Sequence, residues 1–199
     1  MTTGTRVADH PIDPNFLERW SPRAFDGSAL TIDELLPLFE AARWAPSSFN
    51  AQPWRFLYAA NGSAAWDQFV SLLLPFNRMW ARQAGALVFI LSDTVMAPPQ
   101  GGSPSPSHSH SFDAGAAWAL LALQAHANGL YTHGMTGVDF AAAREALNVP
   151  ERFRIEAAIA IGRMGDAATL PEPLRARETP SLRRPIGDSA AAGPFPDNW

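Results

Sequence analysis

Residues 113–128, DAGAAWALLALQAHAN, predict a helix that has no polar face. No charged residue follows Asp113, and the segment ends at Asn128-Gly129, a pair that often terminates helices. A helix that is apolar all round must be covered on every side in an aqueous protein. It therefore lies either in the centre of a domain or at a contact between subunits.

A second helix is predicted to begin at Thr31 and to end near Arg43. Thr31 and Glu34 have the spacing of a capping box, in which each residue satisfies a backbone donor near the other. Apolar residues repeat at helical spacing after the cap and predict one buried face. The expected face consists of Ile32, Leu35, Leu36 and Phe39.

Three segments have the pattern of β-strands. Residues 54–60 alternate bulky and polar side chains, and Asn61-Gly62 after them is a strong turn signal. Residues 85–91 and 153–161 predict buried strands near the middle of a sheet. In the last of these strands we expect one shared face for Ile155, Ala157, Ile159 and Ile161.

Three regions are expected to lack packed structure. Residues 1–11 predict a loose N-terminal arm, and residues 188–199 predict a C-terminal tail. Residues 97–111 are rich in proline, glycine and serine and predict a flexible loop or lid. His108 and His110 in this loop suggest solvated side chains, part of that lid, or two metal ligands. Because no carboxylate or cysteine cluster accompanies them, no metal site is predicted.

Composition limits the classes of protein that this chain can represent. A length of 199 residues with 47% hydrophobic content suits one domain that spans residues 1–199. The absence of cysteine excludes disulfides, thiolate metal ligands and cysteine catalysis. A net charge of −4, without a face rich in lysine or arginine, argues against nucleic acid and anionic membranes as partners. We expect a cytoplasmic protein, because the N-terminus lacks the apolar core of a signal peptide and no apolar stretch reaches the ~18 residues of a membrane span.

Two short motifs carry the chemistry. Arg19-Trp20-Ser21-Pro22-Arg23 places two guanidiniums and a hydroxyl close together, which suits a phosphate group. In the second motif Ser47, Ser48 and Asn50 carry short polar side chains that bind polyols and ring edges. The turn at Gln52-Pro53-Trp54 leads from there into the predicted strand.

With these two motifs the chain resembles the nitroreductase-like FMN-dependent oxidoreductases. The stretches RWSPRAF and ARWAPSSFNAQPWRF carry most of the resemblance. Asn77, Gly134-Met135-Thr136-Gly137 and Arg183-Arg184-Pro185 follow in the family's order, so the resemblance covers residues 16–187. It implies an α+β fold with three layers (α/β/α), in which helices flank a central, mostly antiparallel mixed sheet. It also implies a homodimer with the long apolar helix at the interface and FMN sites built from both subunits.

The resemblance further implies roles for individual residues. Arg19 and Ser21, together with Arg183, would hold the FMN phosphate and ribityl chain, and Arg23 would lie near N1 and O2 of the ring. Asn77 would pair with the N3 and O4 edge. The remaining cofactor-binding residues are implied to be Trp20 beside the phosphate motif, Met135, Thr136 and Gly137 near N5, and Pro46, Ser47, Ser48 and Asn50 from the partner subunit. His133, next to the N5 segment, either contacts the substrate or packs in the interior.

Three positions depart from the family pattern or leave it open. Ser181 stands where many relatives have a lysine for the phosphate, so this chain has one cation fewer there. Trp80 stands where a smaller or charged group is expected and would narrow the flavin pocket. Either Arg183 or Arg184 could meet the phosphate, and the spacing to Pro185 favours Arg183.

The resemblance predicts an FMN-dependent NAD(P)H oxidoreductase of the nitroreductase type. Hydride would pass by a ping-pong sequence through flavin N5 to a nitroaromatic, a quinone or a related small acceptor, without a catalytic side chain. The alternatives are a specialised flavoenzyme of the same fold, acting in ene-reduction, dehalogenation or flavin consumption, or a flavin carrier or sensor without turnover. No Ser-His-Asp set, P-loop or glycine-rich dinucleotide fingerprint supports a hydrolase, a kinase or a Rossmann dehydrogenase.

Overall fold

The computed structural model describes residues 6–97 and 101–196 of the chain. The described helices are α1 (Pro14–Glu18), α2 (Ile32–Arg43), α3 (Trp66–Ser71), α4 (Pro75–Ala81), α5 (His110–Ala127), α6 (Phe140–Ala146) and α7 (Glu172–Arg175). The described strands are β1 (Trp54–Ala60), β2 (Ala86–Asp93), β3 (Val95–Met96), β4 (Ser105–Pro106), β5 (Tyr131–Met135) and β6 (Phe153–Gly162). Short 3₁₀ turns lie at Ser48–Asn50, Ala167–Thr169 and Ile186–Asp188.

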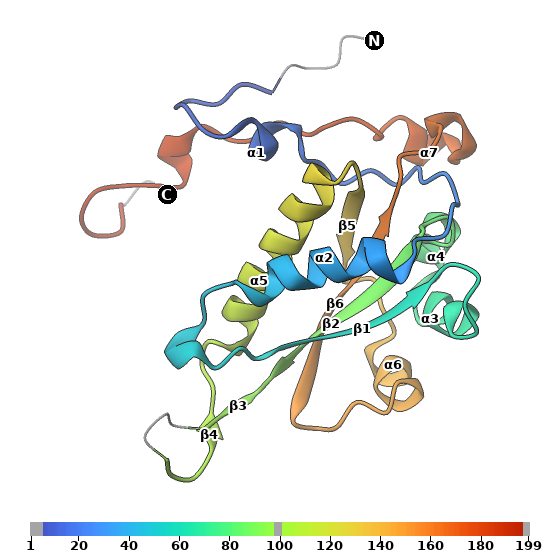
Figure 1. The fold of residues 1–199 in the computed structure, drawn as a ribbon. Helices are drawn as coiled ribbons and strands as arrows, with labels where there is room; N and C mark the ends of the chain where they lie inside the picture. The colour runs from blue at the N-terminus through green and yellow to red at the C-terminus, as the bar shows by residue number, and fades with distance from the viewer. Residues whose placement is uncertain (1–5, 98–100, 197–199) are drawn as a thin grey trace.

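A sheet in the order β1-β2-β6-β5 forms the centre, and each neighbouring pair of strands in it is antiparallel. Every residue of β2 is buried, so both faces of the sheet are covered at this strand. Helices α2 and α5 lie on one face, and α3, α4 and α6 lie on the other (Figure 1). The expected α+β fold with helices flanking an antiparallel sheet is confirmed.

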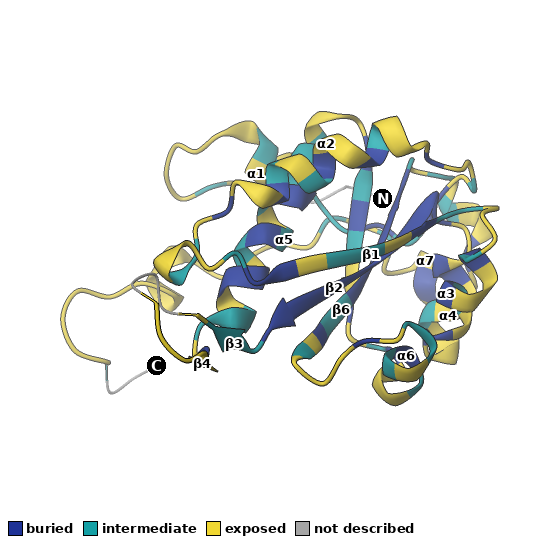
Figure 2. Cartoon of the chain, turned by 60° about the horizontal axis from the view of Figure 1, so that its bottom comes forward, coloured by how far each residue is buried: buried dark blue, intermediate teal, exposed yellow. Residues whose placement is uncertain are grey.

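Two hydrophobic cores hold these layers together. Under α2 and α5, Leu35 and Leu121 pack with Val88 of the sheet. On the opposite face, Trp80 packs with Phe89 in a core that also includes residues of α3 and α6. The burial pattern in Figure 2 follows this layering, because the dark residues lie along β2 and β6 and on the helix sides that face them. Removal of apolar surface on both faces is the main stabilising contribution expected for such a sheet.

The prediction that Ile155, Ala157, Ile159 and Ile161 share one face is wrong at Ile155, because β6 contains a bulge. Ile90 is paired with Ala157, but the next residue, Leu91, is paired with Ile155, which leaves Glu156 as an extra residue. A bulge of this kind shifts the alternation of the strand by one residue. Ile155 therefore packs on the face of α3 and α6, whereas the other three pack under α2 and α5.

Helix α2 begins at the predicted cap and ends at the predicted residue, but it buries a different side. Leu35, Leu38 and Ala42 are buried, while Ile32 and Leu36 are 44% and 52% exposed. The predicted face was therefore wrong at Ile32 and Leu36. Apolar residues occur on both sides of this helix, and only its contacts with α5 and the sheet decide which side faces inward.

Helix α5 begins at His110, three residues before the predicted start, and ends at the predicted cap, where Gly129 has a φ of 74°. One side of it, which includes Ala117 and Leu121, is buried against α2 and the sheet. The opposite side is exposed in the single chain, and Phe112 there is 81% exposed. The chain alone therefore covers only one side of this apolar helix.

The described parts of the predicted loop at 97–111 and of the predicted arm at 1–11 are more ordered than expected. Strands β3 and β4 pair across the loop, and α5 already begins within it. In the arm, Asp9 accepts a hydrogen bond of 2.7 Å from the backbone of Ile186, which ties the two ends of the chain together. Residues 1–5, 98–100 and 197–199 of these predicted segments lie outside the described residues. No helix in the described part is both long and apolar enough to cross a membrane.

The α2 cap yields the first testable prediction. The Thr31 hydroxyl accepts from the backbone of Glu34 at 3.3 Å, and the Glu34 carboxylate accepts from the backbone of Thr31 at 2.8 Å. Replacing Thr31 by alanine should lower the free energy of unfolding by about 1 kcal/mol, measured by urea denaturation. Thr31→Ser keeps the hydroxyl and is the matched control. Equal stability of Thr31→Ala and wild type would contradict the role of the cap.

Candidate functional site

The first motif lies in a hollow of about 380 Å³ that is lined mainly by arginines. Segments from three parts of the chain build it: the N-terminal arm, the stretch after α1, and the stretch after α7, with one residue from β5. The described lining residues are Arg6, Arg19, Trp20, Ser21, Arg23, His133, Arg177, Thr179, Ser181 and Arg183. Five of these are arginines and none is acidic, so this hollow is suited to an anion.

Crowding of the guanidiniums changes their electrostatics. Burial lowers the pKa of Arg19 below the usual arginine value, and the charge of Arg183 lowers it further. The pKa of Arg6 is lowered by burial and then by Arg183 and Arg19. Arginine stays protonated in spite of such shifts. The shifts therefore reflect burial first and repulsion between fixed positive charges second, and a bound anion would relieve the repulsion.

Glu178 holds the second arginine of the motif in place. One oxygen of its carboxylate accepts hydrogen bonds from the backbone of Arg23 at 2.6 Å and of Ala24 at 2.8 Å. The other oxygen lies 3.9 Å from the Arg23 guanidinium, and the Glu178 side chain is only 3% exposed. In the described structure the Nε of Arg23 and the Oε2 of Glu178 are both buried without a hydrogen-bond partner, so the Arg23 side chain keeps an unused donor. A polar atom left in this way is costly unless a ligand satisfies it.

His133 lies on the floor of the same hollow and is held from two sides. Its Nδ1 is 2.9 Å from the carbonyl oxygen of Pro22, which can only accept, so Nδ1 carries the hydrogen. Its ring centre lies 4.6 Å from that of Trp80. Burial lowers the pKa of His133, and the nearby charge of Arg23 also lowers it. His133 is therefore a neutral group that both packs in the interior and lines the hollow.

Trp80 is an interior residue, only 1% exposed, that stacks on Phe25. With Arg23 it also lines a second hollow of about 450 Å³. Trp80 is not among the described residues that line the arginine hollow, and it approaches that hollow through its contact with His133. Trp20, by contrast, packs edge-on against Tyr131 of β5 and lines the first hollow.

The structure brings Asn77 into contact with Gly137, two residues beyond the end of β5. The Asn77 amide donates to the carbonyl oxygen of Gly137 at 3.2 Å. A Cβ at position 137 would stand 2.3 Å from the Asn77 amide nitrogen, so only glycine permits this contact. Gly134 at the other end of this segment lines a further hollow, of about 370 Å³, together with Arg19 and Ser21. His133 and Gly134 of β5 therefore lie next to the arginine motif.

The second motif lies apart from the first within one chain. The backbone of Ser48 donates to the Asp113 carboxylate at 3.2 Å, near the start of α5, and Ser47 accepts from the backbone of Gln52. The first motif lies near α1 and the opposite end of α5 (Figure 1). None of Pro46, Ser47, Ser48 and Asn50 is among the described residues that line the arginine hollow.

The backbone of the second motif is strained. Phe49, Asn50 and Gln52 have φ values of 51°, 54° and 48°, in the left-handed region that side chains disfavour. Three such residues within four positions are costly, and strain of this kind concentrates at binding sites.

The stretch after α7 resolves which late arginine faces the hollow. Arg183 lines it and donates to the Ser181 hydroxyl at 3.1 Å, whereas Arg184 lines a separate hollow between the arm and the tail. Ser181 provides no positive charge where many relatives have a lysine, but Arg6 and Arg177 add two positive charges to the same hollow. Sequence reasoning missed these two arginines and Glu178, because long-range chain crossings place them and no local spacing marks them.

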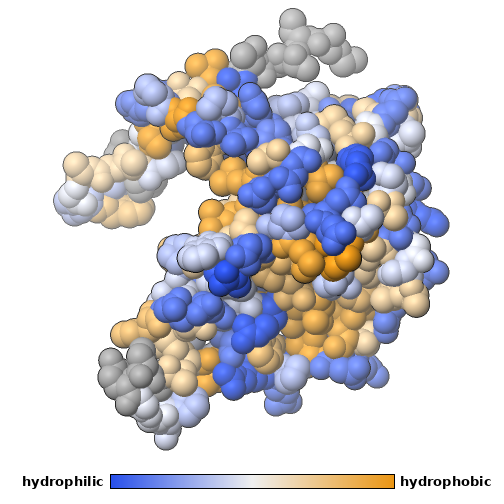
Figure 3. Space-filling view, in the orientation of Figure 1, coloured by the Kyte–Doolittle hydropathy of each residue, from blue (hydrophilic) through white to orange (hydrophobic). Residues whose placement is uncertain are grey.

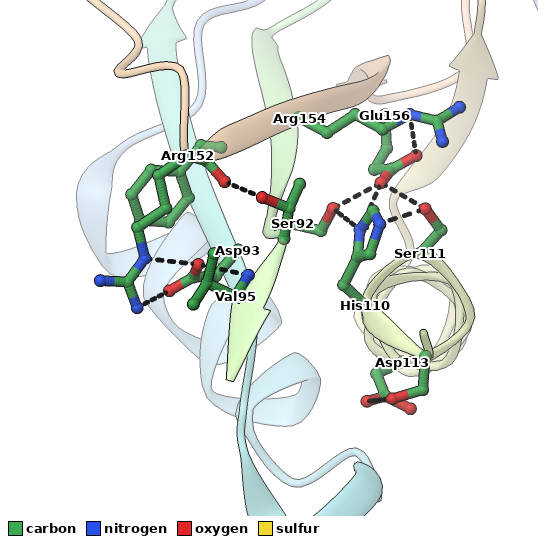
Figure 4. A network of polar contacts seen from close by, with 12 residues as sticks. Ser92, Asp93, Val95, His110, Ser111, Asp113, Arg152, Arg154 and Glu156 are labelled. Atoms are coloured by element: carbon green, nitrogen blue, oxygen red, sulfur yellow. Dashed lines mark hydrogen bonds and ion pairs between the residues drawn. The ribbon is translucent and has the colours of Figure 1, made fainter. Parts of the chain in front are cut away.

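A polar cluster lies at the start of α5, where Figure 4 shows the side chains converging. Ser92 lies 2.7 Å from His110 Nδ1, and Ser111 donates to Glu156 at 2.7 Å. Glu156 also approaches Nδ1 of His110, at 3.5 Å. Because serine and carboxylate meet the same ring nitrogen, this is not the geometry of a catalytic triad, which uses both nitrogens. The cluster ties α5 to the bulge of β6. In the described residues no three potential metal ligands gather, here or elsewhere.

Comparison with known proteins gives consistent results. The Nitroreductase family matches residues 17–74 and 66–163. A solved oxidoreductase that contains FMN is 47% identical, with 98% of this chain and 99% of that chain covered and a TM-score of 0.93. A nitroreductase family protein from Streptococcus pneumoniae is 20% identical, with 88% and 96% covered and a TM-score of 0.70. An uncharacterized 15.4 kDa protein of Mycolicibacterium smegmatis is 32% identical over 63% of this chain and 85% of its own length.

The environment of His133 yields a prediction about pH. Its imidazole should titrate below the usual value of about 6.5, because burial and Arg23 disfavour the charged form. Since the folded-state pKa is lower than the unfolded one, protonation favours unfolding, and stability should decline as the pH falls from about 6.5 towards the folded-state pKa. NMR titration of the ring, assigned by loss of its signal in His133→Asn, measures this value. A pKa above 6.5 would contradict this description of the ring.

Proposed function

Because the chain belongs to the Nitroreductase family, we propose that it is an FMN-dependent oxidoreductase that takes electrons from NADH or NADPH and passes them to a small acceptor such as a nitroaromatic or a quinone. The single observation that carries this proposal is the arginine hollow, where five guanidiniums and a serine hydroxyl surround a space without an acidic side chain among its described residues. The 47% identical structure, which contains FMN, supports the same cofactor.

The residues present fit the phosphate end of FMN. A phosphate monoester carries close to two negative charges, and arginine forks bind such oxygens with charge-assisted hydrogen bonds. Arg19, Ser21 and Arg183 would hold the phosphate and the ribityl chain beside it. The repulsion between Arg19 and Arg183, which adds to the effect of burial in lowering the pKa of Arg19, would then be offset by the ligand.

The residues beyond the phosphate site fit the flavin ring. Arg23 keeps an unused donor, and a cation near N1 and O2 stabilises negative charge that develops there. Asn77 offers both a donor and an acceptor, which the N3 and O4 edge requires. Gly137 leaves room for the Asn77 amide beside it, and the backbone of Met135 and Thr136 would lie near N5 of the ring. When bound, FMN supplies the redox chemistry, and the task of the chain is to position the cofactor and tune its charge.

A second copy of this chain is proposed to complete the site. The exposed side of α5, with Phe112, Gly115 and Ala119, is an uncovered apolar surface, and a Cβ added at Gly115 would meet nothing within 4 Å. Such surfaces commonly mark subunit contacts. The backbone of Ser48 donates a hydrogen bond to Asp113 at the start of α5. A second copy that packs on α5 would therefore have residues 46–50 of the first copy close to its own flavin site. Pro46, Ser47, Ser48 and Asn50 would then contact FMN bound by the partner.

The experiment that tests the function is an anaerobic titration of the purified protein with NADH and NADPH. The visible flavin bands should bleach with one equivalent of NADH or NADPH per flavin and return on addition of a nitroaromatic or quinone. Free FMN at the same concentration is the control for the uncatalysed reaction. A protein that stays colourless after incubation with FMN would overturn the proposal, and a bound flavin that stays oxidised would favour a carrier or sensor.

The proposed dimer is tested with a charge on the open side of α5. Ala119→Glu places a carboxylate in this apolar surface, and burying it against a second copy would cost several kcal/mol. We expect the variant to run as a monomer in light scattering, a readout that does not depend on the hollow that Ala119 lines beside Arg19 and Ser21. Ala141→Glu, at an exposed position of α6, is the matched control and should leave the dimer intact. A dimeric Ala119→Glu protein would refute the interface.

A further inference from the structure

Arg6 enters the arginine hollow from the N-terminal arm, far in sequence from the other residues there. Its Nη1 donates to the carbonyl oxygens of Leu17 at 2.9 Å and of Arg19 at 2.7 Å. Its Nε donates to the carbonyl oxygen of Ser181 at 2.9 Å. One side chain therefore joins the arm, the start of the arginine motif and the stretch after α7.

These contacts use only some of the donors of the guanidinium, and none of them pairs its positive charge with a carboxylate. Arginine has five donors, and among the described residues the Nη2 group of Arg6 makes no hydrogen bond. All three acceptors are neutral carbonyls. No carboxylate is among the described residues that line the hollow, and the nearby Glu178 contacts the backbone and the guanidinium of Arg23 instead. The charge of Arg6 is therefore not balanced by the chain.

A purely structural clamp would not be placed among like charges. The nearest cations, Arg19 and Arg183, repel Arg6, and this repulsion together with burial lowers the pKa of Arg6. The arm nevertheless folds so that Arg6 points at the same hollow as both of them. An anion held between the three guanidiniums would turn this repulsion into attraction, and a phosphate monoester has the charge and the number of oxygens to contact all three.

We propose that Arg6 is a phosphate ligand of the cofactor, and that the described part of the N-terminal arm, residues 6–11, borders the phosphate end of the site through this residue. The inference rests on the proposed function, because the anion is the phosphate of FMN. It extends the phosphate site beyond Arg19, Ser21 and Arg183 and gives the arm a role in binding. FMN and riboflavin share the ring and the ribityl chain and differ in the phosphate. Arg6 should therefore strengthen the binding of FMN and leave the binding of riboflavin unchanged.

The test compares the affinities of flavin-free protein for FMN and for riboflavin, measured by the quenching of flavin fluorescence. Arg6→Gln removes the charge and keeps a polar side chain. We expect its Kd for FMN to rise roughly tenfold or more, as for loss of a charge-assisted hydrogen bond, while its Kd for riboflavin stays unchanged. Arg184→Gln is the matched control, since Arg184 lines a different hollow, and both affinities should stay at the wild-type values.

Salt provides a second readout. At about 0.5 M KCl, where charges are screened over a few ångströms, the difference between wild type and Arg6→Gln for FMN should shrink. Equal weakening of FMN and riboflavin binding in Arg6→Gln would show a purely structural clamp and overturn the inference. An unchanged Kd for FMN would also overturn it. Failure of wild type to bind either flavin would instead overturn the proposed function itself, so the two failures are distinguishable.

Discussion

Burial of β2 and β6 on both faces is the constraint on which the rest of the structure depends. A sheet whose central strand has no exposed residue needs a layer of helices on each side, and α2 with α5 supplies one layer while α3, α4 and α6 supply the other. This layering leaves β5 at the edge of the sheet, beside the chain that follows α1. The candidate site forms at that edge, where His133 and the arginine motif meet, because the interior has no room for charged groups.

Charge is distributed unevenly over this framework. The chain as a whole is negative, with a net charge of −4, yet five arginines converge on one hollow. Glu178 compensates only Arg23 and fixes its backbone, which positions the motif without filling the hollow with negative charge. The arginines that remain uncompensated store unfavourable repulsion in the free protein. A site arranged in this way gains affinity for a dianion and discriminates against neutral ligands, because a neutral ligand would leave the repulsion in place.

Local patterns predicted what local interactions decide. The cap at Thr31, the strand at 54–60 and the end of α5 at Asn128-Gly129 all depend on neighbouring residues, and the structure confirms them. The prediction that four residues of β6 share one face was wrong, because a bulge at Glu156 shifts the alternation of side chains between the two faces. A bulge of this kind depends on pairing with β2. Arg6, Arg177 and Glu178 could not be found from the sequence, since crossings between the two ends of the chain bring them to the hollow. Asn77 and Gly137 were placed together by resemblance, and their contact has a steric reason that only the structure supplies.

The strained second motif gains a physical reason when the site is considered as a shared one. Within one chain, Phe49, Asn50 and Gln52 hold disfavoured backbone angles at a segment that lines none of the arginine hollow in the described structure. Strain persists only where surrounding contacts hold it, and here the bond from Ser48 to Asp113 fixes the segment to α5. If α5 is the subunit contact, the same helix that buries the apolar surface of the dimer also sets the position of the strained segment. Dimerisation and completion of the flavin site would then depend on one element, and loss of the contact on α5 would weaken cofactor binding without any change in the arginine hollow.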